Sequence, residues 1–236
     1  MLRVTVWNEF LHERTEESIR AVYPEGIHNC IKEFLQTDEI EVRTATLDMP
    51  ECGLPDEVLE STDVMIWWSH AKQDDLPDEI AKKVADRVLK GMGLIVLHSA
   101  HKSKPFMRLM GTTCDLAWRD GDRERIWCCN PSHPIAQGIP EHFELPEEEM
   151  YGEFFDIPQP DDLIFLGWFR GGEVFRSGCT FRRGHGKVFY FQPGHEAHPI
   201  YKNEIIQQII KNAVQWAKPS SSVETLACRH PEALEK

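Results

Sequence analysis

The chain has 236 residues, a formal net charge of −13 and seven cysteines. This length suits one large domain with a sizeable core. The excess of acidic residues argues against duplex nucleic acid and anionic membranes as partners, because both attract basic surfaces. An odd number of cysteines without a Cys-x-x-Cys pair argues against a disulfide framework and against a zinc ribbon.

No apolar run has the length of a signal peptide or of a membrane span. We therefore expect a cytoplasmic protein whose cysteines are reduced. The net charge permits a symmetric homo-oligomer, but the sequence leaves the oligomeric state open.

The first 110 residues alternate between strand and helix patterns. Residues 63–68 and 93–98 are almost entirely apolar, as expected for strands that are covered on both faces. Apolar residues recur at helical spacing after Ile27, and Pro77 followed by two acids opens a further helix that ends near Gly91. The expected elements are strands at residues 2–8, 41–47, 63–68 and 93–98, and helices at residues 27–35, 77–90 and 104–110.

The second half of the chain has a different pattern. Between residues 119 and 183, short β-like runs alternate with Gly and Pro, and no clear helix is present. Residues 173–182 and 187–192 flank the segment Arg183-Gly184-His185-Gly186, which indicates a hairpin turn. A last helix is expected over residues 200–216.

Strands that alternate with helices predict a parallel sheet with right-handed crossovers. We predict an α/β fold with a mostly parallel central sheet flanked by helices and an added antiparallel β region. Residues 1–218 would form a single domain, and residues 219–236 a polar C-terminal tail.

Polar residues follow four of the predicted strands, and five of the eleven histidines lie there. Ligands of open parallel sheets bind outside the carboxyl ends of the strands. We therefore expect a functional cluster at this edge, although a single histidine at a strand end is more often a hydrogen-bonded structural residue or a surface residue. The segments are Asn8-Glu9-Phe10-Leu11-His12-Glu13, Ser69-His70, His98-Ser99-Ala100-His101 and Gln192-Pro193-Gly194-His195-Glu196.

Two kinds of chemistry are open to such a cluster. Imidazoles together with carboxylates can bind a divalent metal such as zinc or manganese, and they can act as general acid and base near neutral pH. The spacing of the histidines does not decide between metal binding and acid–base catalysis. No His-Glu-x-x-His occurs, and His98-x-x-His101 is a ligand pair only in a tight turn. The candidate metal ligands are His70, His98, His101 and His195. No nucleotide cofactor is expected.

Two further segments have an ordinary and a functional interpretation. Ser99 lies where a nucleophile elbow would be, but the glycines of Gly-x-Ser-x-Gly are absent, so a helix cap is the expected role. Residues 147–153 combine carboxylates with Tyr151 and Gly152. They predict either a solvated loop or a loop that closes on a sugar, since carboxylates bind hydroxyl groups and aromatic rings cover sugar faces.

Taken together, several segments resemble the ThuA-like (trehalose utilisation) family, over residues 3 to about 218. Each segment alone is unspecific, whereas the set is specific. The segments are Val6-Trp7-Asn8-Glu9-Phe10 with His12-Glu13, Ile66-Trp67-Trp68-Ser69-His70, Leu97-His98-Ser99-Ala100-His101-Lys102-Ser103-Lys104, Ser132-His133-Pro134-Ile135, Glu148-Glu149-Met150-Tyr151-Gly152-Glu153, Gly171-Gly172-Glu173-Val174-Phe175-Arg176-Ser177-Gly178-Cys179 and Pro193-Gly194-His195-Glu196.

The resemblance implies a flavodoxin-like, class I glutamine amidotransferase-like fold and a bacterial role in the breakdown of trehalose and related disaccharides. It also implies a functional link to sugar oxidoreductases that make 3-keto glycosides. The expected enzyme would isomerise such a keto-sugar or cleave its glycosidic bond. Its expected catalytic residues are His98, His101, Glu153 and His195, and its expected substrate-binding residues are Asn8, Glu9, His12, His70, Ser99, Tyr151 and Glu196.

True glutamine amidotransferases carry a Gly-x-Cys-x-Gly elbow, and this sequence has Ser99 in the corresponding place. Cysteine thiolate chemistry is therefore excluded there, and no glutaminase activity is expected. The alternative to an enzyme is a non-enzymatic carbohydrate-binding or partner protein that uses the same crevice. The missing elbow favours this alternative, and the density of His and Glu favours the enzyme.

Overall fold

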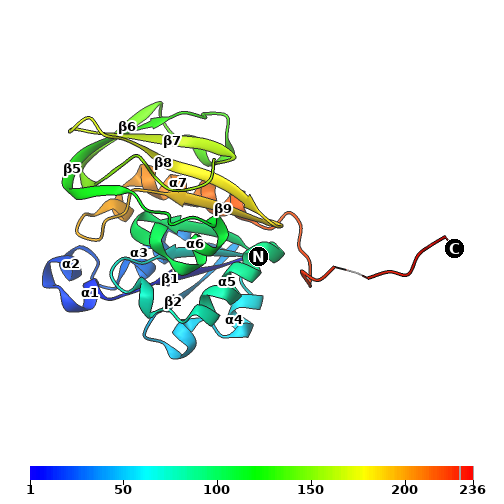
Figure 1. The fold of residues 1–236 in the computed structure, drawn as a ribbon. Coiled ribbons are helices and arrows are strands. Elements are labelled where there is room, and N and C mark those ends of the chain that lie inside the picture. The colour runs from blue at the N-terminus through cyan, green and yellow to red at the C-terminus, as the bar shows by residue number, and fades with distance from the viewer. Residues whose placement is uncertain (229, 236) are drawn as a thin grey trace.

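The fold is built on one nine-stranded sheet, in a computed structural model that describes residues 1–228 and 230–235. The strand order is β2-β1-β3-β4-β9-β8-β7-β5-β6 (Figure 1). The strands are β1 (Leu2–Asn8), β2 (Ile40–Thr46), β3 (Val64–Trp68), β4 (Gly93–Leu97), β5 (Ala117–Cys128), β6 (His142–Gly152), β7 (Asp162–Phe169), β8 (Val174–Arg183) and β9 (Gly186–Phe191).

The prediction of a mostly parallel sheet is not confirmed, because the sheet is mixed. Neighbouring strands from β2 to β9 are parallel, whereas every pairing from β9 through β8, β7 and β5 to β6 is antiparallel. The α/β class and the antiparallel addition agree with the sequence. The antiparallel part is large because residues 117–191 lack the long helices that parallel crossovers require.

Helices cover both faces of the sheet. They are α1 (His12–Thr15), α2 (Glu17–Val22), α3 (Ile27–Leu35), α4 (Asp56–Glu60), α5 (Asp78–Lys90), α6 (Lys104–Met110) and α7 (Glu204–Ala217). Short 3₁₀ turns occupy Pro50–Gly53, Gln73–Asp75, His98–Lys102, Pro134–Ala136 and Ile200–Lys202.

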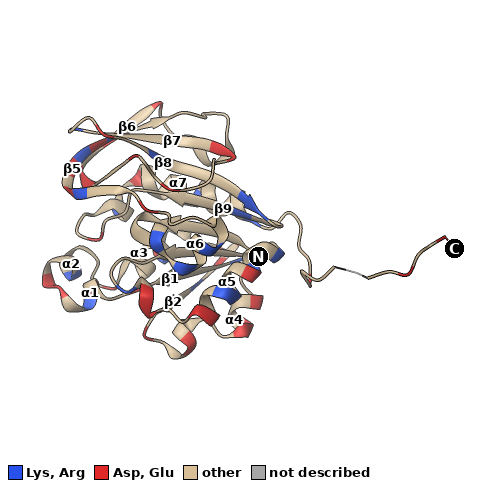
Figure 2. Cartoon of the chain, in the orientation of Figure 1, with Lys and Arg blue, Asp and Glu red and all other residues tan. Residues whose placement is uncertain are grey.

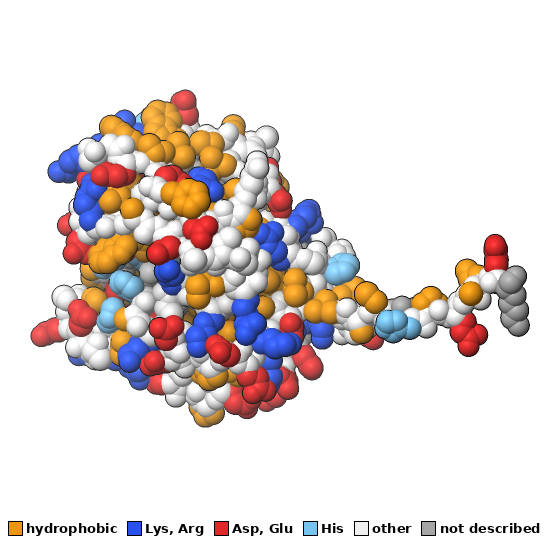
Figure 3. Space-filling model, viewed as in Figure 1, with side chains coloured by type: hydrophobic (Ala, Val, Ile, Leu, Met, Phe, Trp, Pro, Cys, Tyr) orange, Lys and Arg blue, Asp and Glu red, His pale blue; other side chains and the backbone are white. Residues whose placement is uncertain are grey.

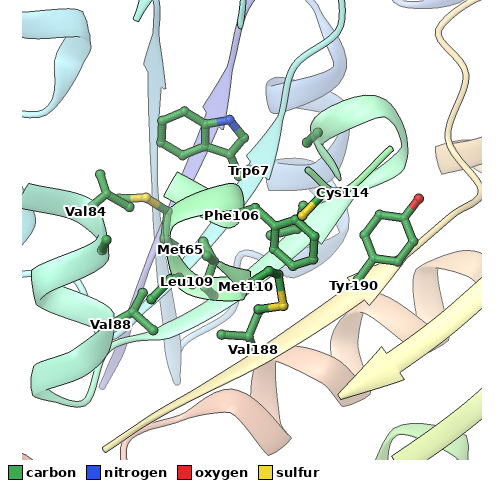
Figure 4. Close-up of a cluster of buried hydrophobic side chains, with 14 of the residues drawn as sticks. Met65, Trp67, Val84, Val88, Phe106, Leu109, Met110, Cys114, Val188 and Tyr190 are labelled. Atoms are coloured by element: carbon green, nitrogen blue, oxygen red, sulfur yellow. The ribbon is translucent and has the colours of Figure 1, made fainter. Parts of the chain in front are cut away.

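Two apolar clusters, one on each face, hold these layers together. In the first, residues of α5 and α6 such as Val84 and Phe106 pack against Met65 and Tyr190 of the sheet (Figure 4). In the second, α3 and α7 pack against the opposite side chains of the same strands. Removing a phenylalanine-sized side chain from water contributes about 2 kcal/mol, so the central strands form a rigid platform for the loops at their ends.

Most predicted elements are confirmed to within a few residues, and α7 is the clearest exception. Its start at Glu204 lies four residues after the expected one. Asn203 sets this start, because its side-chain oxygen accepts hydrogen bonds from the backbone N–H groups of Ile205 and Ile206. The residues before it form a 3₁₀ turn.

The described residues of the tail contain no helix or strand. The Val223 N–H donates to the Lys90 carbonyl at 3.0 Å, and the chain then runs away from the body of the protein (Figure 1). Basic and acidic residues are interspersed over the helices and strands (Figure 2). Within the part of the chain that the structure describes, no helix is long and apolar enough to cross a membrane.

Candidate functional site

The carboxyl ends of β1, β3, β4 and β9 place the predicted histidine loops side by side. The ring centroids of His70, His98 and His195 lie 5.4 to 6.2 Å apart. His12 joins them at 5.4 Å from His70. We call these four residues with Glu149 and Glu196 the His/Glu cluster. Histidine side chains are visible beside hydrophobic ones on one face of the molecule (Figure 3).

His98 occupies the turn that follows β4, with a positive φ of 53°. A positive φ is uncommon for a residue other than glycine, and such residues are often found at functional sites. It is therefore His98, rather than the adjacent Ser99, that stands in the elbow conformation. The Ser99 hydroxyl donates a hydrogen bond to the Ser69 carbonyl at 2.8 Å, which fixes it in a structural contact.

The imidazole of His98 is fully buried, and each of its two ring nitrogens contacts an oxygen. Its Nδ1 donates to the Gln192 carbonyl at 2.8 Å, and its Nε2 lies 3.0 Å from Oε2 of Glu149. Burial alone lowers the pKa of His98, but Glu149 and the carboxylates of Glu148 and Glu196 raise it to about 9. His98 is therefore an imidazolium at neutral pH.

Glu148 and Glu149 come from the buried end of β6, where the sequence suggested a loop. The Glu148 carboxylate accepts hydrogen bonds from the backbone N–H groups of Gly194, His195 and Glu149. A Cβ at Gly194 would lie 2.1 Å from Oη of Tyr201, so only glycine fits this turn. Glu148 thus holds the loop that carries His195.

Glu196 binds two histidines from other strand ends. Its Oε1 lies 2.5 Å from Nδ1 of His12 and 2.7 Å from Nδ1 of His70. Burial alone raises the pKa of Glu196, but these hydrogen bonds lower it far below the usual range. The hydrogen bond from His12 in turn raises the pKa of that imidazole. Glu196 is therefore ionised and orients both rings.

Glu9 and Asn8 lie at the same edge of the sheet, but their side chains are buried and bond to groups of the protein itself. The Glu9 carboxylate accepts the backbone N–H groups of His70, Ala71 and Lys72 at 2.8 to 3.0 Å. Asn8 donates to the carboxylate of Glu13 at 2.7 Å. Glu9 therefore holds the loop of His70 as Glu148 holds the loop of His195.

His101 lies beside Tyr151. Among the described residues, it does not belong to any of the groups of His and Glu side chains whose nitrogen and oxygen atoms are close enough to share a metal ion. Its Nδ1 donates to the Cys114 carbonyl at 2.6 Å. Burial lowers the pKa of His101 to about 4, so the ring is neutral and its Nε2 carries a lone pair. Tyr151 stacks on His98 with a centroid distance of 5.0 Å.

The structure does not bring Glu153 into the cluster. Its carboxylate pairs with Arg176 at 2.7 Å and accepts the backbone N–H of Phe155 at 2.8 Å. The carboxylate nearest to His98 is Glu149, four residues earlier. Sequence reasoning missed it because three consecutive glutamates are typical of solvent-exposed segments; the apolar Met150 and Tyr151 that follow were the only signal of burial.

Two adjoining hollows open at the His/Glu cluster. One, of about 400 Å³, is lined by His70, Ala71, Gln73, Asp74, Lys102 and Met107. The other, of about 210 Å³, is lined by His70, Gln73, Ser99, His101, Lys102, Asp115, Trp118, Glu149 and Tyr151. A further hollow of about 440 Å³ between Leu145 and Asn203 contains none of the cluster's ligand atoms, so we place the site at the first two.

The cluster has the donor set of a divalent-metal site. His70, Glu149 and His195 offer ligand atoms within 4.8 Å of one another, and two overlapping groups add His12, His98 and Glu196. The buried Oε2 of Glu196 has no hydrogen-bond partner among the described residues. Buried carboxylate oxygens are normally satisfied, so the residues present fit a bound cation.

The fold and the site define an α/β protein with one large mixed sheet and a His/Glu cluster at its strand ends. The family model for ThuA, described as trehalose utilisation, matches residues 3–217. The chain therefore belongs to the ThuA family, and the resemblance seen in the sequence is confirmed.

Several solved structures have a similar fold. A ThuA-like protein from Parabacteroides merdae matches with a TM-score of 0.68 and 14% identity, over 94% of this chain and 92% of that one. A cytoplasmic protein from Salmonella typhimurium matches with a TM-score of 0.62 and 14% identity, over 92% and 100%. A glutamine amidotransferase from Thermotoga maritima matches with a TM-score of 0.51 and 6% identity, over 91% and 97%. No curated protein sequence matches the chain significantly.

Proposed function

We propose that the protein is an enzyme of disaccharide catabolism that acts on an oxidised (3-keto) disaccharide at the His/Glu cluster. One observation carries the proposal: ionisable side chains from four strand ends form one cluster, and two members of it, His70 and Glu149, line the hollows beside it. Sites that bind a sugar without turnover rely on amides and aromatic rings, whereas this one concentrates groups that bind metals and move protons.

The ketone allows cleavage without the paired carboxylates of ordinary glycosidases. A base removes the proton from the carbon between the ketone and the glycosidic carbon, and the electron pair moves onto the carbonyl oxygen. The pair then returns and expels the glycosidic oxygen, which takes up a proton. Protonation of the same carbon from its other face instead gives an isomer of the substrate. The ionised Glu149, which contacts His98 at 3.0 Å, is placed to accept the proton in the metal-free protein. With Glu149 bound to a metal, the neutral imidazole of His101 would take this role.

Two further groups would stabilise charge on the carbonyl oxygen. The positive charge of the His98 imidazolium would act only through space, because both of its ring nitrogens already contact Gln192 and Glu149. Burial raises the pKa of Tyr151 well above its usual value. Tyr151 therefore keeps its proton and can donate a hydrogen bond. Preorganised donors of this kind contribute most where charge develops.

We also propose a resident divalent metal, zinc or manganese, held by His70, Glu149 and His195. Glu196 would fix the ring of His70 from behind, in the carboxylate–histidine–metal arrangement common in metal sites. Nδ1 of His195 accepts a hydrogen bond from the Ala197 N–H at 3.1 Å. To bind a metal through Nε2, the neutral ring would move its proton to Nδ1 and give up this hydrogen bond. A bound divalent ion would polarise the ketone oxygen.

The test combines metal content with turnover. Protein purified without a His tag is expected to contain about one zinc or manganese per chain by elemental mass spectrometry, as one such site predicts. Replacing both His98 and His195 by Ala should abolish consumption of 3-keto-trehalose with the fold intact. The matched control His185→Ala alters an exposed histidine in the β8–β9 turn and should change neither result.

Retained turnover in the double variant would refute the site assignment. Binding of the sugar without consumption by wild-type protein would instead favour a carbohydrate-binding or partner protein, which the lack of a nucleophile at the elbow permits. We place the protein in the cytoplasm with a sugar oxidoreductase as its functional partner, since an oxidising enzyme must supply the ketone.

A further inference from the structure

Trp118 is an exposed indole directly beside the buried site. It lies on β5, opposite Tyr151 of β6 in the antiparallel register. Residues that pair in this way project from the same face of a sheet, and both line the smaller hollow. Tyr151 is buried, whereas the side chain of Trp118 is 63% exposed. Trp118 therefore forms the outer wall of a hollow whose lining includes His70 and Glu149 of the His/Glu cluster.

An indole held at the mouth of a polar hollow is suited to a sugar ring. The CH faces of a hexose pack on aromatic rings, while its hydroxyl groups need charged or polar partners. The hollow beside Trp118 supplies such partners in Glu149, His101 and the ion pair of Lys102 with Asp115 at 3.1 Å.

The two hollows differ in what they offer a ligand. They share His70, Gln73 and Lys102. The smaller one contains the groups that move protons, and the larger one adds only Ala71, Asp74 and Met107, which can contact a ligand but hold no acid–base pair beside the cluster. Gln73 is fixed between them, because its amide donates to the Ser99 carbonyl at 2.9 Å.

We propose that the two hollows are two sugar subsites. The smaller hollow, beside Trp118, takes the ring that reacts, stacked on the indole. The larger hollow, beside Met107, takes the second unit of the disaccharide. The bond between the two units then lies over His70. This inference rests on the proposed function for its substrate class, but it makes a claim about binding that can be tested without turnover.

The first test measures binding of unoxidised trehalose by isothermal titration calorimetry, so that no reaction interferes. Trp118→Ala should raise the Kd about tenfold, and Trp118→Phe should restore most of the affinity, since a lost aromatic contact is worth about 1 kcal/mol or more. The matched control is Trp127→Ala, which removes a 36% exposed tryptophan of the same strand outside the residues that line either hollow. This control should leave the Kd unchanged.

The second test separates the subsites. Ala71→Phe adds a side chain at an exposed position of the larger hollow, and should weaken trehalose binding about tenfold or more while glucose binding stays the same, because filling a pocket excludes only the ligand unit that enters it. Trp118→Ala should weaken binding of both sugars. Thermal melting of each variant checks that the fold is intact.

The results distinguish this inference from the proposed function. If the binding pattern holds but 3-keto-trehalose is not consumed, the subsites stand and the enzymatic proposal fails. If 3-keto-trehalose is consumed but trehalose binding is undetectable, or is indifferent to Trp118→Ala, the subsite assignment is overturned. Equal loss of glucose and trehalose binding in a folded Ala71→Phe variant also overturns it.

Discussion

Nδ1 of His70 lies 2.7 Å from Oε1 of Glu196, although 126 residues separate the two in the sequence. Oε1 of the same carboxylate also contacts His12. Glu196 therefore acts on the site by orienting two rings, and its own Oε2 remains without a partner among the described residues.

Glu196→Gln should weaken metal binding about 10- to 100-fold, as the loss of a carboxylate behind a ligating histidine does elsewhere. Titration of the metal-free protein with zinc against a competing chelator measures this. Glu17→Gln, at an exposed position of α2, is the control and should not alter the affinity. An unchanged zinc affinity in Glu196→Gln would show that His70 is not a ligand.

Glu9→Gln should destabilise the protein and disturb His70. The carboxylate serves three backbone N–H groups through two oxygens, and an amide replaces one of these acceptors by a donor. A buried donor left without its acceptor costs about 1–3 kcal/mol. Urea unfolding measures the change in free energy. A midpoint equal to that of wild type would mean that the loop of His70 does not depend on Glu9.

The pair of Glu153 with Arg176 predicts a dependence of stability on acid. Burial alone raises the pKa of Glu153, but hydrogen bonds from Arg176 and from backbone N–H groups lower it below its usual value. A carboxylate whose pKa is lower in the folded than in the unfolded protein stabilises the fold at pH values above its unfolded pKa, near 4.5. This contribution is lost as the pH falls through the lower folded value.

Because the pair is partly exposed, its contribution should be about 1 kcal/mol or less. Arg176→Gln should lower the free energy of unfolding at pH 6 by about that amount. It should also reduce the loss of this free energy between pH 5 and 3, because the pKa of Glu153 is then closer to its value in the unfolded chain. Arg182→Gln, at an exposed position of β8, is the control.

Turnover that survives in Glu153→Gln would support Glu149 rather than Glu153 as the reacting carboxylate.

The protein should release no ammonia from glutamine. The residue in the strained turn after β4 is His98, and its imidazole is fully engaged with Gln192 and Glu149. No thiol is therefore presented at the elbow. A coupled ammonia assay on purified protein checks this, and activity that persists through repeated purification would contradict it.

The sequence predicts the central strands well, because β3 and β4 are buried on both faces and therefore read as continuous apolar runs. It also predicts that the histidines of four loops share one edge, since parallel strands end together. It fails for β6, because Glu148 lies in the core only through contacts with backbone N–H groups of a loop 46 residues away. No local pattern signals such a partner. The size of the antiparallel region is hidden because its strands are irregular, with register shifts between β5 and β6 and between β7 and β8, and because glycines interrupt them.

The way in which Glu9 holds its loop also bears on how the family can vary. The contacts reach only main-chain N–H groups of residues 70–72, so the side chains at positions 71 and 72 can change freely without moving His70. Proline is the exception, because it lacks the N–H. Substrate preference could therefore drift through Ala71, on the wall of the larger hollow, while the reacting centre keeps its geometry.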